Sequence, residues 1–240
     1  MKGQKSILFL GEIIILTLLL VLLPCSSLST PYLEDKLIYK VMTKEKVIAI
    51  TFDDGPHPVY TPELLDILDK YGVKATFFMI GSQMERYPNI VKEVSRRGHI
   101  IGNHTYHHRG NLNTQSRSIV IGEMKHWDQT AERITGQETE LFRPPRGLTG
   151  GNILIAAEEK GYTTVIWTIC GDNHLTPTPE LMAKRVEDRI GPGGIILLHD
   201  GATKSRWMDV KAADLIIKSL QQRGYRFVTI PELLKYRVSG

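Results

Sequence analysis

The sequence predicts a single-domain α/β protein in which about seven parallel strands form a small barrel. Short β-branched runs alternate with longer amphipathic runs as far as the C-terminus, which is typical of parallel strands joined by crossover helices. The 240 residues, 42% of them hydrophobic, suffice for one complete core. No linker or change in composition interrupts residues 40–240, so these observations favour one domain.

Residues 1–29 have the layout of a secretory signal, with a basic start, an apolar run over Ile13–Leu23, and Pro24 followed by small residues. The run is short for a bilayer span, so we expect cleavage, with retention as a membrane anchor or lipidation at Cys25 as alternatives. An extracytoplasmic location follows, either secreted or associated with the cell wall or membrane. We expect residues 30–45 to be a connector and residues 46–240 to be the catalytic domain.

Strand candidates lie at residues 47–52, 75–80, 99–102, 140–142, 163–167, 194–198 and 226–229. Helical patterns lie between them, at residues 62–71, 88–97, 116–135, 151–160, 179–190 and 210–223. Thr61 before Pro62 suits an N-cap, and glycines 72, 98, 136, 161 and 224 follow helix ends.

The formal net charge is only +4, and no basic run is present, so nucleic acid is not expected as a partner. Contact with a membrane is expected only through the N-terminal segment. Once that segment is removed Cys170 is the single cysteine, which precludes an internal disulfide.

Polar residues follow the ends of the predicted strands, and in a parallel barrel these positions converge at one face. Asp53 and Asp54 are adjacent carboxylates whose repulsion a cation or a divided protonation role would relieve, although an acidic turn in water is the alternative. His104 and His108 have an i, i+4 spacing that on a helical turn directs both imidazoles to one side. With Asp54 they would form a catalytic zinc site with one open position, unless the histidines merely cap or bridge.

Two further segments carry candidate residues. Two prolines follow Arg143 and could hold it as a rigid fork against a carboxylate, whereas a surface turn is the alternative. His199 ends an apolar strand, where it could donate a proton or simply be hydrogen-bonded.

These residues resemble the polysaccharide deacetylase, or NodB-homology, family across about residues 47–234. Its first, second, third and fifth motifs are similar to Thr51–Pro56, His104–His108, Arg143–Gly147 and Leu197–His199. The resemblance implies a distorted (β/α) barrel and a divalent metal, Zn²⁺ or Co²⁺.

The resemblance also implies roles for single residues. Asp53 would be the general base that Arg143 orients, and His199 the general acid. Asp54, His104 and His108 would bind the metal, and Leu197 would line the pocket for the acetyl methyl group.

Two segments depart from the family pattern. Arg146 stands where an aromatic residue is usual, so we expect it at the substrate rim. The fourth motif, which begins at Trp167, has Cys170 and Asn173 where acids are expected, and Asp172 could substitute by a shift of one residue. Trp167 and Asp172 are therefore candidate substrate-binding residues, and the partner that tunes His199 is left open.

The expected function is metal-dependent removal of N-acetyl groups from N-acetylglucosamine units of an acetylated polysaccharide. Peptidoglycan is the first choice and chitooligosaccharide the second. The alternatives are de-O-acetylation of a xylan-type polysaccharide, a catalytically silent carbohydrate-binding homologue, and a domain that uses metal only for stability.

Overall fold

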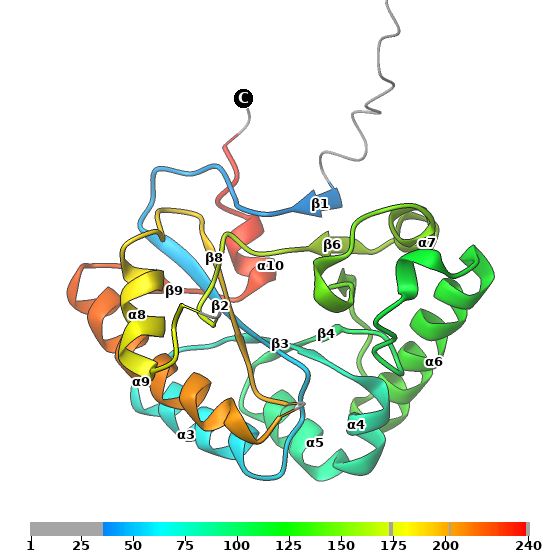
Figure 1. Ribbon diagram of the computed structural model, residues 1–240, viewed down its shortest axis with the longest axis horizontal. Coiled ribbons are helices and arrows are strands. Elements are labelled where there is room, and N and C mark those ends of the chain that lie inside the picture. Colours follow the sequence, from blue (N-terminus) through cyan, green and yellow to red (C-terminus); the bar gives the residue numbers. More distant parts are fainter. Residues whose placement is uncertain (1–35, 173–174, 202, 239–240) are drawn as a thin grey trace, which may run out of the picture. The chain divides into compact units, whose positions relative to one another are not determined.

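The computed structural model describes residues 36–172, 175–201 and 203–238. The expected signal segment with Cys25, and Asn173 of the fourth motif, lie outside the described residues. Within them the strands form one nine-stranded parallel sheet in the order β1-β6-β5-β4-β3-β2-β8-β7, and β9 pairs with β2. The sheet curls into an incomplete barrel (Figure 1), which confirms the predicted fold.

The strands are β1 (Leu37–Ile38), β2 (Val47–Asp53), β3 (Thr76–Met79), β4 (Ile100–Asn103), β5 (Leu141–Phe142), β6 (Thr163–Val165), β7 (Ile169–Cys170), β8 (Ile195–His199) and β9 (Arg226–Phe227). The helices are α3 (Tyr60–Lys70), α4 (Gly81–Arg86), α5 (Pro88–Arg96), α6 (Arg117–Thr135), α7 (Asn152–Glu159), α8 (Pro179–Glu187), α9 (Trp207–Gln222) and α10 (Ile230–Leu234). Single 3-10 turns cover Leu112–Thr114, Pro145–Gly147 and Lys204–Arg206.

Four short elements were not predicted. Strand β1 lies in the stretch expected to be a connector, and its pairing with β6 makes these residues part of the sheet. Strand β7 is equally short, and helices α4 and α10 have only six and five residues. Elements of two to six residues are too short to display a hydrophobic period.

The expected N-cap at Thr61 is wrong by two residues, because α3 begins at Tyr60 and its N-cap is Val59. The Thr61 hydroxyl instead donates a hydrogen bond of 2.5 Å to the Asp200 carboxylate, which joins α3 to the loop after β8. The glycines expected at helix ends all have positive φ, and Gly136 forms a left-handed C-cap for α6 at φ 67°.

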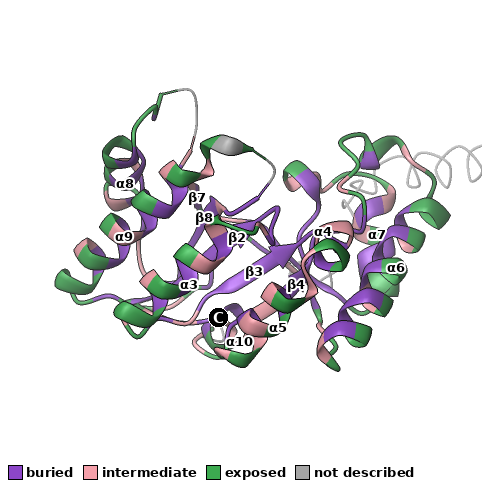
Figure 2. Ribbon diagram, turned by 90° about the horizontal axis from the view of Figure 1, so that it is seen from below, coloured by how far each residue is buried: buried purple, intermediate pink, exposed green. Residues whose placement is uncertain are grey.

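Alternate residues of each central strand pack into different parts of the core, because successive side chains point to opposite faces of a sheet. Ile48 and Ile50 of β2 pack with the surrounding helices, whereas Val47 and Ala49 pack inside the curled sheet. Helix α10 covers that interior with Ile230 and other apolar residues. Figure 2 shows buried strands and exposed outer helix faces. Burial on both faces explains why the central strands have continuous apolar runs.

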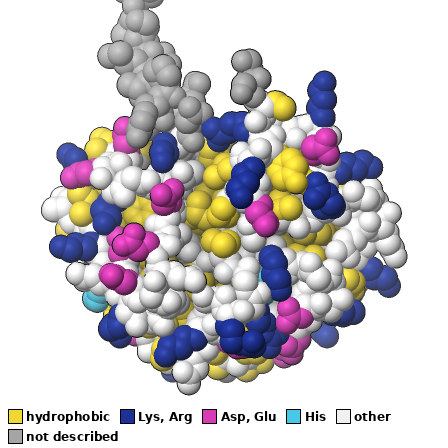
Figure 3. Space-filling model, turned by 180° about the vertical axis from the view of Figure 1, so that it is seen from behind, with side chains coloured by type: hydrophobic (Ala, Val, Ile, Leu, Met, Phe, Trp, Pro, Cys, Tyr) yellow, Lys and Arg dark blue, Asp and Glu magenta, His cyan; other side chains and the backbone are white. Residues whose placement is uncertain are grey.

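On the face drawn in Figure 3, Lys and Arg side chains are interspersed with Asp and Glu. Among the described residues no helix has the length and apolar character needed to cross a membrane.

Candidate active site

The candidate residues converge where parallel strands end. In the register of β2 and β8, Asp53 lies opposite His199. Asn103 of β4 pairs with Phe142 of β5, which sets the residues that follow, His104 and Arg143, side by side. One face of the barrel therefore collects side chains that are far apart in the sequence.

Arg143 is fully buried and is held at every nitrogen of its guanidinium group. Its Nε and Nη2 donate to the backbone oxygens of Val165 and Ile166, both at 2.9 Å. Its Nη1 donates to Thr51 Oγ1 at 2.8 Å and to Asp53 Oδ1 at 2.7 Å. The interpretation of Arg143 as part of a surface turn is therefore wrong, and its guanidinium makes a charge-assisted hydrogen bond to one oxygen of the buried Asp53 carboxylate.

Asp54, His104 and His108 form a group that fits a divalent metal, because one ligand atom from each lies within 4.8 Å of the others. Asp54 Oδ1 is 3.6 Å from His104 Nε2 and 3.3 Å from His108 Nε2. His104 Nδ1 donates a hydrogen bond to the backbone oxygen of Arg143 at 2.7 Å, so the free lone pair of the ring is on Nε2. A carboxylate with two imidazoles is a donor set of catalytic zinc.

The two histidines meet through a loop and not through the helical turn that their spacing predicted. The chain is left-handed at Thr105 (φ 65°) and His108 (φ 54°). The Asn103 side-chain oxygen accepts a hydrogen bond from the backbone N–H of Thr105 at 2.8 Å. The Thr105 hydroxyl accepts one from the backbone N–H of His108 at 3.0 Å. These bonds stabilise the strained loop, and the imidazole centroids lie 4.9 Å apart.

Burial opposes ionisation of Asp54, but a hydrogen bond from His104, together with smaller electrostatic contributions from the nearby histidines, lowers its pKa below the usual range. Burial lowers the pKa of His108. Burial opposes the imidazolium form of His104, but Asp53 and Asp54 raise its pKa. An ionised carboxylate and a neutral imidazole are the forms that bind metal, so metal binding at this site would displace a proton from His104 wherever that ring is protonated.

The loops after β2 and β8 pack closely together. A Cβ atom on Gly55 would lie 2.3 Å from Asp200 Oδ2, and one on Gly201 would lie 2.0 Å from the backbone oxygen of Asp54. Only glycine fits at these two positions. Asp200 is fully buried, and burial raises its pKa to about 7.

Two carboxylates lie near His199, whose partner the sequence left open. Its Nδ1 is 3.5 Å from Asp172 Oδ1 and 3.7 Å from Asp209 Oδ1, and its backbone N–H donates to Asp209 at 3.0 Å. Burial disfavours the imidazolium, but Asp209, Asp53 and Asp172 raise the pKa of His199 above its ordinary value. Cys170 Sγ donates to Asp172, so the thiol supports the acid that stands near His199.

Arg206 and Asp209 were missed by the sequence analysis. Arg206 Nη1 donates to Asp172 at 2.7 Å and lies 3.4 Å from Asp209, and Nη2 is 3.8 Å from Asp54. The only signal in the sequence was their i, i+3 spacing at the start of a helix, which is typical of any surface ion pair.

The expected substrate residues lie around this centre. Arg146 is exposed and left-handed (φ 58°), and its guanidinium approaches Gly110. Trp167 is half-buried, close to Gly147 and 5.8 Å from the Arg143 guanidinium. Leu197 lies two residues before His199 in β8, so both side chains face the barrel interior.

Comparisons with known proteins agree with this geometry. A family model for polysaccharide deacetylases matches residues 40–165. A peptidoglycan-N-acetylglucosamine deacetylase of Bacillus cereus is 40% identical over 204 residues, covering 83% of this chain and 93% of the relative. The peptidoglycan-N-acetylmuramic acid deacetylase PdaA of Bacillus subtilis is 36% identical, covering 80% of this chain and 73% of the relative.

Solved structures show the same likeness. The crystal structure of a peptidoglycan N-acetylglucosamine deacetylase in complex with an N-hydroxybenzamide derivative has a TM-score of 0.80 at 32% identity. The match covers 85% of this chain and 96% of that one. The fold and the site thus define an α/β-barrel hydrolase. More specifically, the chain belongs to the polysaccharide deacetylase family and is a deacetylase.

Proposed function

We propose that this enzyme removes N-acetyl groups from N-acetylglucosamine units of peptidoglycan, with chitooligosaccharide as the second substrate. One observation carries the proposal. The buried Asp53–Arg143 ion pair, at 2.7 Å, lies beside the Asp54, His104 and His108 group. Such a site combines a proton acceptor with a place for a cation. The names of the relatives support peptidoglycan as the first choice.

Asp54, His104 and His108 would hold the metal, for which we propose Zn²⁺ with Co²⁺ as a substitute. The set of two imidazoles and one carboxylate supports that choice. When bound, the metal supplies Lewis-acid polarisation of the acetamide carbonyl and makes water more acidic.

The protein's own residues would then move the protons. Asp53 accepts the proton of the attacking water through Oδ2, because Arg143 already occupies Oδ1. The backbone N–H of Arg146 donates to the developing oxyanion, and Leu197 borders the acetyl methyl group. His199 starts protonated, which the neighbouring carboxylates favour, and gives its proton to the departing amine. Acetate and a glucosamine unit are released.

The altered fourth motif is the only feature that favours the alternative, in which this chain is a catalytically silent carbohydrate-binding homologue. Two acids, Asp172 and Asp209, nevertheless lie within 3.7 Å of His199, which supports the enzyme over the silent homologue. We further propose that residues 1–29 direct export and that residues 46–240 act outside the cytoplasm, where an acetylated cell-wall polymer would be available.

Acetate release is the test. The purified chain is assayed on peptidoglycan, chitin oligomers and acetylated xylan, with and without a chelator, and then after addition of Zn²⁺ or Co²⁺. We expect release from peptidoglycan that is lost on chelation and restored by metal. Release from xylan alone would establish de-O-acetylation, and sugar binding without acetate release would establish a silent homologue.

A further inference from the structure

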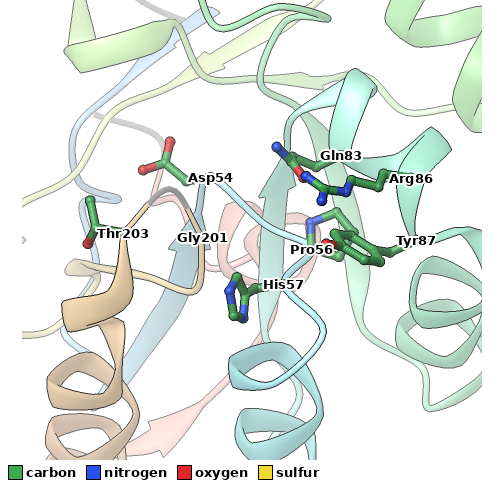
Figure 4. A pocket seen from close by; sticks show the side chains of 8 residues that line it. All are labelled: Asp54, Pro56, His57, Gln83, Arg86, Tyr87, Gly201 and Thr203. Atoms are coloured by element: carbon green, nitrogen blue, oxygen red, sulfur yellow. The ribbon is translucent and has the colours of Figure 1, made fainter.

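A cavity of about 290 Å³ adjoins the candidate active site, between the loop after β2, helix α4 and the loop after β8. Asp54 lies at one side of it, and Gln83, Arg86 and Tyr87 lie at the other (Figure 4). No residue of this cavity other than Asp54 has a role in the proposed reaction. The cavity is of the size at which small-ligand sites begin.

Arg86 is available to a ligand. It is the last residue of α4 and is exposed, and its guanidinium lies 5.3 Å from the Tyr87 ring centroid. The neighbouring acid, Glu85, is occupied by the Tyr106 hydroxyl at 2.7 Å and by Arg133. None of the ion pairs found among the described residues includes Arg86.

His57 adds a second hydrogen-bond donor to the cavity wall. Its Nδ1 accepts the backbone N–H groups of Val59 and Tyr60, at 3.2 and 3.4 Å, so its proton is on Nε2. Burial lowers the pKa of His57, which keeps the ring neutral. The Gln83 amide is a further polar group of the wall, and Asp54, the single acid among the lining residues, is a proposed metal ligand.

We propose that this cavity is a subsite for the sugar next to the one that is deacetylated, and that Arg86 binds a carboxylate on that sugar. A planar guanidinium recognises a carboxylate through two parallel hydrogen bonds. Peptidoglycan glycan strands whose muramic-acid units have lost the stem peptide carry such a carboxylate on the lactyl ether, whereas chitooligosaccharides are uncharged. The inference rests on the proposed function and narrows its substrate to peptidoglycan glycans without stem peptides.

The test compares two substrates that differ in the lactyl group, which is charged in one and a neutral methyl ester in the other. Oligosaccharides of alternating N-acetylglucosamine and N-acetylmuramic acid are used with free lactyl carboxylates and as their methyl esters. Acetate release by the zinc-loaded chain gives kcat/KM for the parent, Arg86→Gln, Arg86→Lys and Lys92→Gln proteins. Lys92 is an exposed residue of α5 and controls for the loss of one positive charge.

We expect the parent and Lys92→Gln proteins to prefer the free carboxylates by about tenfold, a size typical of a charge-assisted hydrogen bond. Arg86→Gln should lose the preference through KM and keep its rate on the esters, and Arg86→Lys should retain part of it. The subsite is overturned if the parent protein shows no preference for the free carboxylates. It is equally overturned if Arg86→Gln keeps that preference, or lowers kcat/KM to the same extent for both substrates. In each case acetate release still supports the deacetylase. If no acetate is released from either glycan or from chitin oligomers, the proposed function fails and the subsite fails with it.

Discussion

Replacement of Asp53 with Asn separates proton transfer from metal binding. The amide oxygen can still accept from Arg143 Nη1, which is 2.7 Å from Oδ1, but the side chain can no longer take a proton from water. A positioned general base contributes about 10²- to 10⁴-fold, so we expect kcat to fall by at least about 100-fold. Asp54, His104 and His108 are unchanged, so the metal content should stay at the parental level.

The same substitution leaves the buried Arg143 without a counterion. Full loss of a buried pair costs about 3–5 kcal/mol, and a retained hydrogen bond to Asn should limit the cost to about 1–3 kcal/mol. Urea unfolding measures this free energy, elemental analysis measures the metal, and acetate release measures turnover. Asp66→Asn, at an acid whose side chain is 74% exposed, is the matched control. If Asp53→Asn loses metal and activity in parallel, Asp53 is a ligand and the assignment of the base is wrong.

Three other changes test the rest of the site. His104→Gln should abolish stoichiometric metal binding and acetate release together, and retained metal by elemental analysis would contradict its role as a ligand. Because His199 must start protonated and its pKa is raised, kcat/KM should fall as pH rises through that pKa. Asp209→Asn should lower the pKa of His199 and so move this fall to lower pH. An unchanged pH profile would show that Asp209 does not act on His199. Gly55→Ala should destabilise the fold by about 1–3 kcal/mol, because its Cβ would lie 2.3 Å from Asp200, and an unchanged melting temperature would show that the two loops can separate.

The strands that carry the site could be predicted because each has a continuous apolar run that ends in a polar residue. Strand β2 ends at Asp53, and β8 ends at His199, so the parallel arrangement alone implies that these residues meet. Strands β1 and β7 could not be predicted, since two residues have no measurable period and pair only because the neighbouring strand is in place.

Other features depend on contacts between distant segments. The left-handed loop from His104 to His108 exists because side chains within and before it satisfy its backbone N–H groups, and an i, i+4 spacing gives no sign of that. Arg86 is in none of the ion pairs found among the described residues, and the adjacent Glu85 is bonded to Tyr106 and Arg133.

The order of apolar runs and polar strand ends indicated a parallel barrel and the candidate residues at its strand ends, because runs and end residues are local properties of the chain, and the family resemblance supplied the expected roles. Only the tertiary structure decided what surrounds them. Asp209 comes close to His199 because α9 packs beside β8, and the cavity exists because helix α4 and the loops after β2 and β8 meet next to Asp54. Charges and donors from separate elements become neighbours only when the chain folds, so their combined effect on a pKa or a ligand cannot be read from spacing.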